Sequence, residues 1–159
     1  MTFAAWVLGL ALLTLIFSDQ LERQQNPNRN AQAVLGAQGS RALVLKRNRA
    51  GQYVAGGSIN GYPVTFLLDT GATDVAIPEP VARRIGLERG RPGISRTAAG
   101  DVVTWTALLR SVDLGGFTLY TIPATILPDM PGDQVLLGMS YLKRLEMVQR
   151  GDTLTLRLP

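Results

Sequence analysis

The sequence predicts an all-β fold with one or two short helices, preceded by an N-terminal transmembrane helix. Short β-prone apolar runs recur along the chain, and many of its 17 glycines and 9 prolines separate them. Asn60-Gly61 stands between two such runs and is a strong hairpin signal. The first residues form an uncharged apolar run, and 159 residues leave room for one domain plus such an appendage.

The N-terminal run contains neither charge nor proline from Phe3 to Phe17. Counted from Met1 it offers about 17 residues, the short end of what spans a bilayer. We therefore predict a transmembrane anchor at residues 1–18. A cleaved signal peptide and a core helix are the alternatives. No Lys or Arg precedes the run, and the small-residue site Ala31-Gln32-Ala33 lies too far downstream for ordinary cleavage.

Residues 19–40 are predicted to form a polar linker, because Gln and Asn gather around Pro27 and apolar periodicity disappears. Residues 41–159 then form the folded domain. Its expected elements are strands at 42–45, 52–59, 62–68 and 75–77, a helix at 78–86, strands at 94–97, 102–107, 108–114 and 117–127, a strand-to-helix turn at 135–142 and a closing strand at 153–158. Turns at 48–51, 60–61 and 115–116 and a loop at 128–133 connect them.

Composition excludes several kinds of catalysis. The chain has no His and no Cys, which rules out Ser-His-Asp triads, cysteine nucleophiles, histidine or thiolate metal sites and disulfides. Carboxylate chemistry, a Ser-Lys pair or an oxygen-only metal site remains. Ser140 and Lys143 share one helical turn, but we interpret Lys143 as a solvated helix residue. The net charge of +4 comes mainly from scattered arginines without a basic stripe, so we expect no nucleic-acid partner.

Asp69 is the carboxylate with the most unusual setting. It follows residues 64–68, an apolar run typical of a buried strand, and an unpaired buried carboxylate is costly. Asp69 should therefore be hydrogen-bonded, neutralised by a partner, or present for chemistry. Thr70 can hydrogen-bond across the turn that follows, and Gly71 permits a close approach of the backbone.

The segment Asp69-Thr70-Gly71-Ala72, preceded by Phe66-Leu67-Leu68, resembles the active-site loop of the retropepsin-like aspartic proteases. Residues 135–142 resemble the second hallmark of that family, in which Leu136-Leu137-Gly138 forms a strand-to-helix turn beneath the catalytic loop. The resemblance covers residues 42–158 and is closest to the membrane-anchored bacterial members. It implies a single-lobe closed β-barrel that uses no metal and no other cofactor.

The resemblance also implies roles for individual residues. Asp69 would be the catalytic acid, and Thr70 would brace the active-site loops of two subunits against each other. Thr73 and Asp74 would line the substrate cleft, although viral enzymes usually have an acid where Thr73 stands. The small residues at the tip of the hairpin after the helix would form a flap that folds over a bound peptide. The positions assigned to the active-site loop are Thr70, Gly71 and Ala72, and those assigned to the flap are Ala98, Ala99, Gly100 and Asp101.

Peptide hydrolysis by carboxylates requires two of them sharing a proton, and this chain has one Asp-Thr-Gly. Asp129 and Asp133 lie in turn sequences where Asp is expected, so we interpret them as turn residues. The simplest arrangement is a twofold homodimer in which two copies of Asp69 act on a peptide or protein substrate. A non-catalytic, membrane-tethered peptide- or protein-binding module, and a small β-domain in which Asp69 caps a turn, are the alternatives.

Two signals disagree about the side of the membrane on which the domain lies: the positive charges near the predicted span and the family resemblance. Arg23 and Arg29 follow the predicted span and weakly favour a cytoplasmic domain. The family resemblance implies a single-pass protein of the bacterial inner membrane with a periplasmic catalytic domain. We expect the periplasmic arrangement, because two arginines are weak evidence.

Overall fold

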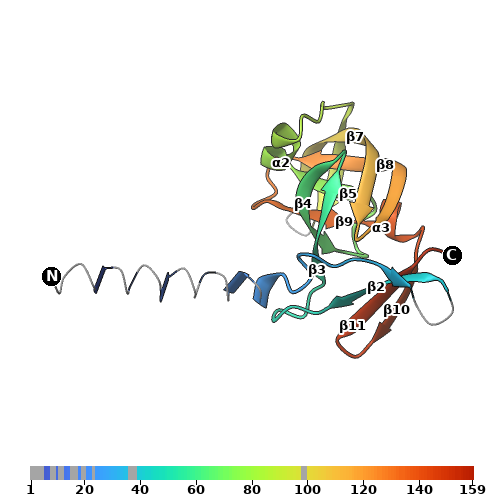
Figure 1. The fold of residues 1–159 in the computed structure, drawn as a ribbon. Coiled ribbons are helices and arrows are strands. Elements are labelled where there is room, and N and C mark those ends of the chain that lie inside the picture. Colours follow the sequence, from blue (N-terminus) through green and yellow to red (C-terminus); the bar gives the residue numbers. More distant parts are fainter. Residues whose placement is uncertain are drawn as a thin grey trace.

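The computed structural model describes residues 26–35, 39–97 and 100–159, together with scattered positions before Asn26 (Figure 1). Each of those scattered positions is helical. Most of the predicted transmembrane anchor, residues 1–18, lies outside the described residues. Within the described part, no helix combines the length and the apolar character needed to cross a bilayer.

The described domain is all-β apart from two short helices, which confirms the predicted fold class. The helices are α2 (Glu79–Arg84) and α3 (Met139–Leu142). The strands, in chain order, are β1 (Val34–Leu35), β2 (Arg41–Lys46), β3 (Val54–Ile59), β4 (Tyr62–Leu68), β5 (Val75–Pro78), β6 (Pro92–Thr97), β7 (Gly100–Leu114), β8 (Phe117–Leu127), β9 (Gln134–Leu137), β10 (Glu146–Arg150) and β11 (Thr153–Arg157).

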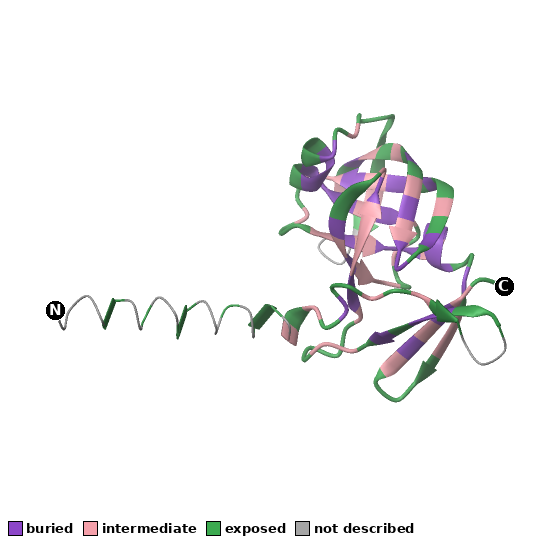
Figure 2. Ribbon diagram, viewed as in Figure 1, coloured by how far each residue is buried: buried purple, intermediate pink, exposed green. Residues whose placement is uncertain are grey.

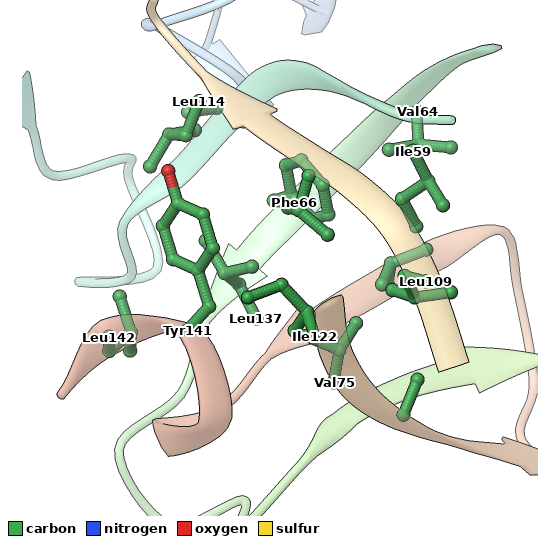
Figure 3. Close-up of a cluster of buried hydrophobic side chains, with 14 of the residues drawn as sticks. Ile59, Val64, Phe66, Val75, Leu109, Leu114, Ile122, Leu137, Tyr141 and Leu142 are labelled. Atoms are coloured by element: carbon green, nitrogen blue, oxygen red, sulfur yellow. The ribbon is translucent and has the colours of Figure 1, made fainter. Parts of the chain in front are cut away.

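The larger sheet closes on itself. Its strands follow the order β3-β4-β9-β5-β8-β7-β6, and residues 58–59 of β3 pair with residues 112–113 of β7 to complete a ring. Strand β6 stays outside this ring as the partner of β7. Apolar side chains from several strands meet inside, among them Phe66, Ile122 and Leu137, all fully buried (Figure 3). The expected closed barrel is therefore present.

The hairpin of β3 and β4 has the turn that its sequence predicts. Asn60 and Gly61 both have positive φ, 52° and 86°, as the two central residues of a type I′ turn require. Strand β4 then runs antiparallel to β3 and ends at Leu68, immediately before Asp69. The hairpin thus fixes where the acid emerges from the barrel.

The smaller sheet has the order β1-β2-β11-β10 and is antiparallel throughout. It lies below the barrel in Figure 1, and its buried leucines, Leu43, Leu45, Leu154 and Leu156, belong to the same hydrophobic core as the barrel (Figure 2). Strand β11 is the predicted closing strand. Strand β10 was not predicted, because a five-residue run with a charge at each end carries little β signal.

Residues 26–35 pack on the domain, although they belong to the segment predicted as a linker. Asn28 is only 6% exposed, and its amide group donates hydrogen bonds to the carbonyls of Lys46 (2.9 Å) and Val54 (2.8 Å). The Asn28 side-chain oxygen accepts one from the Lys46 amide (2.8 Å), and its main-chain oxygen accepts one from Gly56 (3.2 Å). This segment therefore joins the edge of the smaller sheet to strand β3 of the barrel.

A buried carboxylate ties α2 to the chain that follows it. Oxygen Oε1 of Glu79 accepts from the Arg83 side chain at 3.1 Å and lies 2.8 Å from a guanidinium nitrogen of Arg89. The Arg89 guanidinium stacks over the ring of Trp105 in β7, 4.0 Å from its centroid. The Arg89 hydrogen bond, supported by Arg83, lowers the pKa of Glu79 below its ordinary value despite burial, so the carboxylate stays charged.

We predict that Glu79 makes stability depend on pH in the acid range. Because the folded-state pKa lies below the ordinary value of 4.5, the ion pairs stabilise the fold fully above that value. Their contribution is lost as the pH falls through the lowered pKa. Glu79→Gln should therefore lower the free energy of unfolding at neutral pH and flatten its fall in acid, as measured by urea unfolding over a pH series.

The exposed Glu88 provides a matched control. Glu88→Gln should leave both the neutral-pH stability and the acid slope close to those of the parent. Equal slopes for the parent and Glu79→Gln would contradict the assignment.

Candidate active site

Asp69 directly follows strand β4. Its main chain is hydrogen-bonded to β9, and its side chain is hydrogen-bonded to the turn that comes next. Strand β4 runs parallel to β9, and the amide of Asp69 donates to the carbonyl of Leu137 at 3.2 Å. The side chain is half-buried, and its Oδ1 accepts a hydrogen bond from the amide of Gly71 at 2.8 Å. The carboxylate is thereby oriented by the turn that follows it, while Thr70 and Gly71 themselves are exposed.

The loop at residues 69–74 is clamped from below by the start of α3. The amide of Met139 donates to the Ala72 carbonyl and that of Ser140 to the Thr73 carbonyl, both at 2.8 Å. These two amides lie in the first turn of α3, where helix donors have no partner within the helix. The loop carbonyls therefore take the place of helix capping groups.

The Ser140 side chain belongs to the same clamp. Its hydroxyl oxygen accepts from the amide of Val75 (3.1 Å), and the hydroxyl donates to the carbonyl of Pro123 (2.9 Å). Ser140 is buried and Lys143 is exposed, so these residues do not form a Ser-Lys catalytic pair. The interpretation of Lys143 as a solvated residue is confirmed.

The Leu136-Leu137-Gly138 segment lies directly against the loop. Strand β9 pairs with β4 so that Leu136 stands beside Leu67 and Leu137 beside Leu68. A Cβ added to Gly138 would collide with the carbonyl oxygen of Asp74 and lie 2.7 Å from that of Ala72. Only glycine leaves room for this approach of two backbones.

A cleft of about 750 Å³ opens on one side of Asp69. The loop contributes Asp69 and residues 71–74 to its lining, and Leu136 lies beside them. The opposite wall comes from Ser95 and Arg96 of β6 and from β8. The structure therefore brings the predicted cleft residues Thr73 and Asp74 together with Asp69.

Ser95 and Arg96 are cleft residues that the sequence analysis does not identify. No motif distinguishes them, and only the β6–β7 hairpin brings them opposite the loop. In that hairpin Thr97 pairs with Gly100, and Arg96 lies 3.5 Å from the carboxylate of Asp101. Of the predicted flap residues, Gly100 and Asp101 lie in β7, whereas Ala98 and Ala99 lie outside the described residues.

A second hollow, a groove of about 360 Å³, also borders Asp69. Asp69 and Thr70 form one wall, and Met147 and Gln149 of β10 contribute to its lining. The remaining lining residues are Tyr53, Leu68, Leu142 and Leu154. Asp69 therefore lines two hollows, one that includes residues of the β6–β7 hairpin and one that includes residues of the smaller sheet.

The two other candidates for a second acid, Asp129 and Asp133, take no part in this site. Asp129 and Asp133 are exposed in the loop before β9, and neither lines the cleft or the groove. Among the residues that the structure describes, no group of three or more acidic side chains is placed to hold a metal ion.

Comparison with known proteins gives three results. A family model described as gag-polyprotein putative aspartyl protease matches residues 55–144. An uncharacterized protein from the region 5′ of cobV in a Sinorhizobium species is 32% identical over 131 residues, covering 80% of this chain and 56% of that protein. An uncharacterized Rickettsia prowazekii protein is 26% identical over 114 residues, covering 65% of this chain and 46% of that protein. The chain thus spans about half the length of these relatives.

Among solved structures, a crystal structure of a retropepsin-like aspartic protease from Rickettsia conorii superposes with a TM-score of 0.60. The two sequences are 27% identical, and the match covers 74% of this chain and 90% of the other. The match to most of that chain shows that the barrel described above is a retropepsin-like fold.

The clamp beneath the loop can be tested through Gly138. Gly138→Ala should destabilise the protein by about 1–3 kcal/mol, because the added methyl group forces two backbone segments apart. Gly93→Ala is the matched control, since its Cβ would meet nothing closer than the Thr104 hydroxyl at 3.8 Å. Urea unfolding should separate the two variants, and equal losses of stability would refute the proposed crowding at Gly138.

Proposed function

The chain belongs to the retropepsin-like family described as gag-polyprotein putative aspartyl proteases, and from this we propose that it is an aspartic endopeptidase acting as a homodimer. The observation that carries the proposal is the placement of Asp69. Its carboxylate lies on a clamped loop, is oriented by the Gly71 amide and borders a cleft of about 750 Å³. A turn-capping role alone needs the Gly71 contact but no such cleft.

The proposed reaction uses one Asp69 from each of two copies. One carboxylate, ionised, takes a proton from the attacking water, and the other, protonated, donates to the carbonyl oxygen of the scissile peptide bond. Two carboxylates held close together cannot both ionise easily, so the pair shares a proton. When the tetrahedral intermediate collapses, its C–N bond breaks. The carboxylate that took the proton from water gives it to the leaving amine, and the proton on the former carbonyl oxygen returns to the other carboxylate, so the pair again shares one proton.

The substrate would lie in the cleft as an extended strand. Main-chain groups of the loop and of the flap hairpin would bind its backbone, and the alternate side chains would enter pockets on either side. Asp74 and Arg96 border the same cleft with opposite charges. The substrate class is therefore a peptide or an extended segment of a protein.

We predict that Asp69→Asn abolishes peptide cleavage while leaving the fold and the dimer intact. Asparagine keeps the size and the oxygen that accepts from Gly71 but cannot act as the base, so the rate should fall at least about 1,000-fold. The assay compares cleavage of a peptide library, from acidic to neutral pH, with molecular mass and circular dichroism. Asp129→Asn, in the exposed loop, should retain full activity.

Other outcomes identify the alternatives. A parent that binds peptides without cleaving them would indicate a binding module, and unfolding of Asp69→Asn would indicate a structural turn cap. Cleavage by a strictly monomeric parent would remove the need for a second acid.

We propose that the N-terminal run anchors this enzyme in the bacterial inner membrane with the domain in the periplasm. The uncharged stretch at residues 3–17 supports an anchor, and the family resemblance supports the periplasmic side. The full chain should then sediment with membranes, and a chain starting at residue 19 should stay in the soluble fraction. Protease added to spheroplasts should digest the domain, and protection from digestion would place it in the cytoplasm.

A further inference from the structure

Strand β8 changes the face that it turns toward the core at Thr121. Before this residue the odd-numbered positions face inward, with Phe117 fully buried. After it the even-numbered positions face inward, since Ile122, Ala124 and Ile126 are all buried. Side chains alternate along a regular strand, so a change of this kind requires a local break in the strand.

The break is visible in the backbone. Thr121 has a φ of 57°, in the left-handed region, although its side chain is β-branched. Such a conformation is strained and persists only where the surrounding structure holds it. Strand β7 pairs with β8 in the same register on both sides of the break, but Thr121 itself is left out of the ladder. The strand therefore turns about its own axis at one residue without slipping.

This turn decides which side chains of β8 reach the cleft. Thr125 and Leu127 line the cleft that also contains the catalytic loop, and both have odd numbers. If the alternation of the first half of β8 continued, these two residues would face the core as Phe117 does, and the even-numbered residues would face the cleft. The break in β8 is therefore what places this wall of the cleft.

The Arg144 side chain holds the strand at the break. Arg144 lies two residues after the end of α3, and its guanidinium donates to the carbonyl oxygens of Tyr120 (3.0 Å) and Thr121 (3.4 Å). A guanidinium is planar and rigid, so two of its nitrogens fix two acceptors relative to each other. Two successive carbonyls are thus held in the orientation that the left-handed residue gives them.

Two side chains of α3 hold β8 on either side of these contacts. The Tyr141 hydroxyl donates to the Phe117 carbonyl at 2.6 Å, and the Ser140 hydroxyl donates to the Pro123 carbonyl at 2.9 Å. Arg144 contacts the stretch of strand between them. Because the first amides of α3 hold the catalytic loop, α3 and the residue after it contact both the loop and the strand that form the cleft.

We propose that Arg144 is a positioning residue of the cleft, which keeps Thr121 in its left-handed conformation and thereby keeps Thr125 and Leu127 facing a bound peptide. The proposal rests on the proposed function in taking the cleft as the peptide site. Arg144 is exposed and does not line the cleft, so it acts through β8.

Thiol labelling of the full chain tests this role without an activity assay. The native chain has no cysteine, so Thr125→Cys and Ala124→Cys each introduce a single thiol. Thr125 is half-buried in the cleft, whereas Ala124 is 3% exposed. A water-soluble maleimide should therefore label the thiol at 125 at least about tenfold faster than the thiol at 124.

Removing the guanidinium should narrow this difference. Adding Arg144→Met should bring the ratio of the two labelling rates below about threefold, because the segment after the break then leaves its orientation more often. Arg84→Met removes an exposed arginine from α2 and should leave the ratio unchanged. An unchanged ratio in the Arg144→Met chains would overturn the proposal.

A glycine at the break provides the rescue. Glycine adopts positive φ without strain, so Thr121→Gly should restore the ratio in the Arg144→Met chains to at least about tenfold. Val135→Cys, fully buried in β9, reports general unfolding and should stay protected in every background. A ratio that glycine does not restore, or labelling at 135 in the Arg144→Met chain, would show a merely structural role and refute positioning.

Peptide kinetics give the second readout. Arg144→Met should raise KM at least about fivefold and change kcat less than about twofold, because the contacts that hold Asp69 remain. Adding Thr121→Gly should bring KM back. If the labelling follows the expected pattern but the parent cleaves no peptide, the positioning stands and the proposed function falls. If the parent cleaves peptides but the labelling does not depend on Arg144, the function stands and the positioning falls.

Discussion

The site depends on main-chain hydrogen bonds between the loop at residues 69–74 and the turn that joins β9 to α3. The amides of Met139 and Ser140 hold two carbonyls of that loop, and the amide of Asp69 is held by β9 in turn. Main-chain hydrogen bonds can be made by almost any residue, so they restrict few positions of the sequence. The exception is Gly138, where a side chain would collide with the carbonyl oxygens of the loop. The loop is thereby fixed before any substrate binds, which is the condition for a preorganised acid.

Fixing the loop in this way places Asp69 between two hollows with different surroundings. The cleft is lined in part by Ser95 and Arg96 of the β6–β7 hairpin, whereas the groove is lined in part by residues of the smaller sheet. The proposed hydrolysis needs a second acid from another copy, because each chain has one Asp-Thr-Gly. Hydrogen bonds from Asn28 to Lys46 of β2 and Val54 of β3 tie the smaller sheet to the barrel.

Much of this arrangement could be predicted from local signals. The Asn60-Gly61 turn requires positive φ at both positions, so the hairpin and the exit point of Asp69 follow from two residues. What the sequence could not predict depends on distant partners. Asn28 in a polar stretch gives no sign of burial, since its hydrogen bonds go to carbonyls 18 and 26 residues away. Arg96 likewise becomes a cleft residue only through the hairpin that carries it.

The shared pair of acids is tested most directly by mixing parent chains with chains that lack the acid. Parent and Asp69→Asn chains are expressed together in equal amounts, and peptide cleavage is compared with that of the same total amount of parent alone. If each site needs two acids from two copies, random pairing leaves about one quarter of the activity. A remaining activity of about one half would mean that each copy works independently, and would contradict the shared pair.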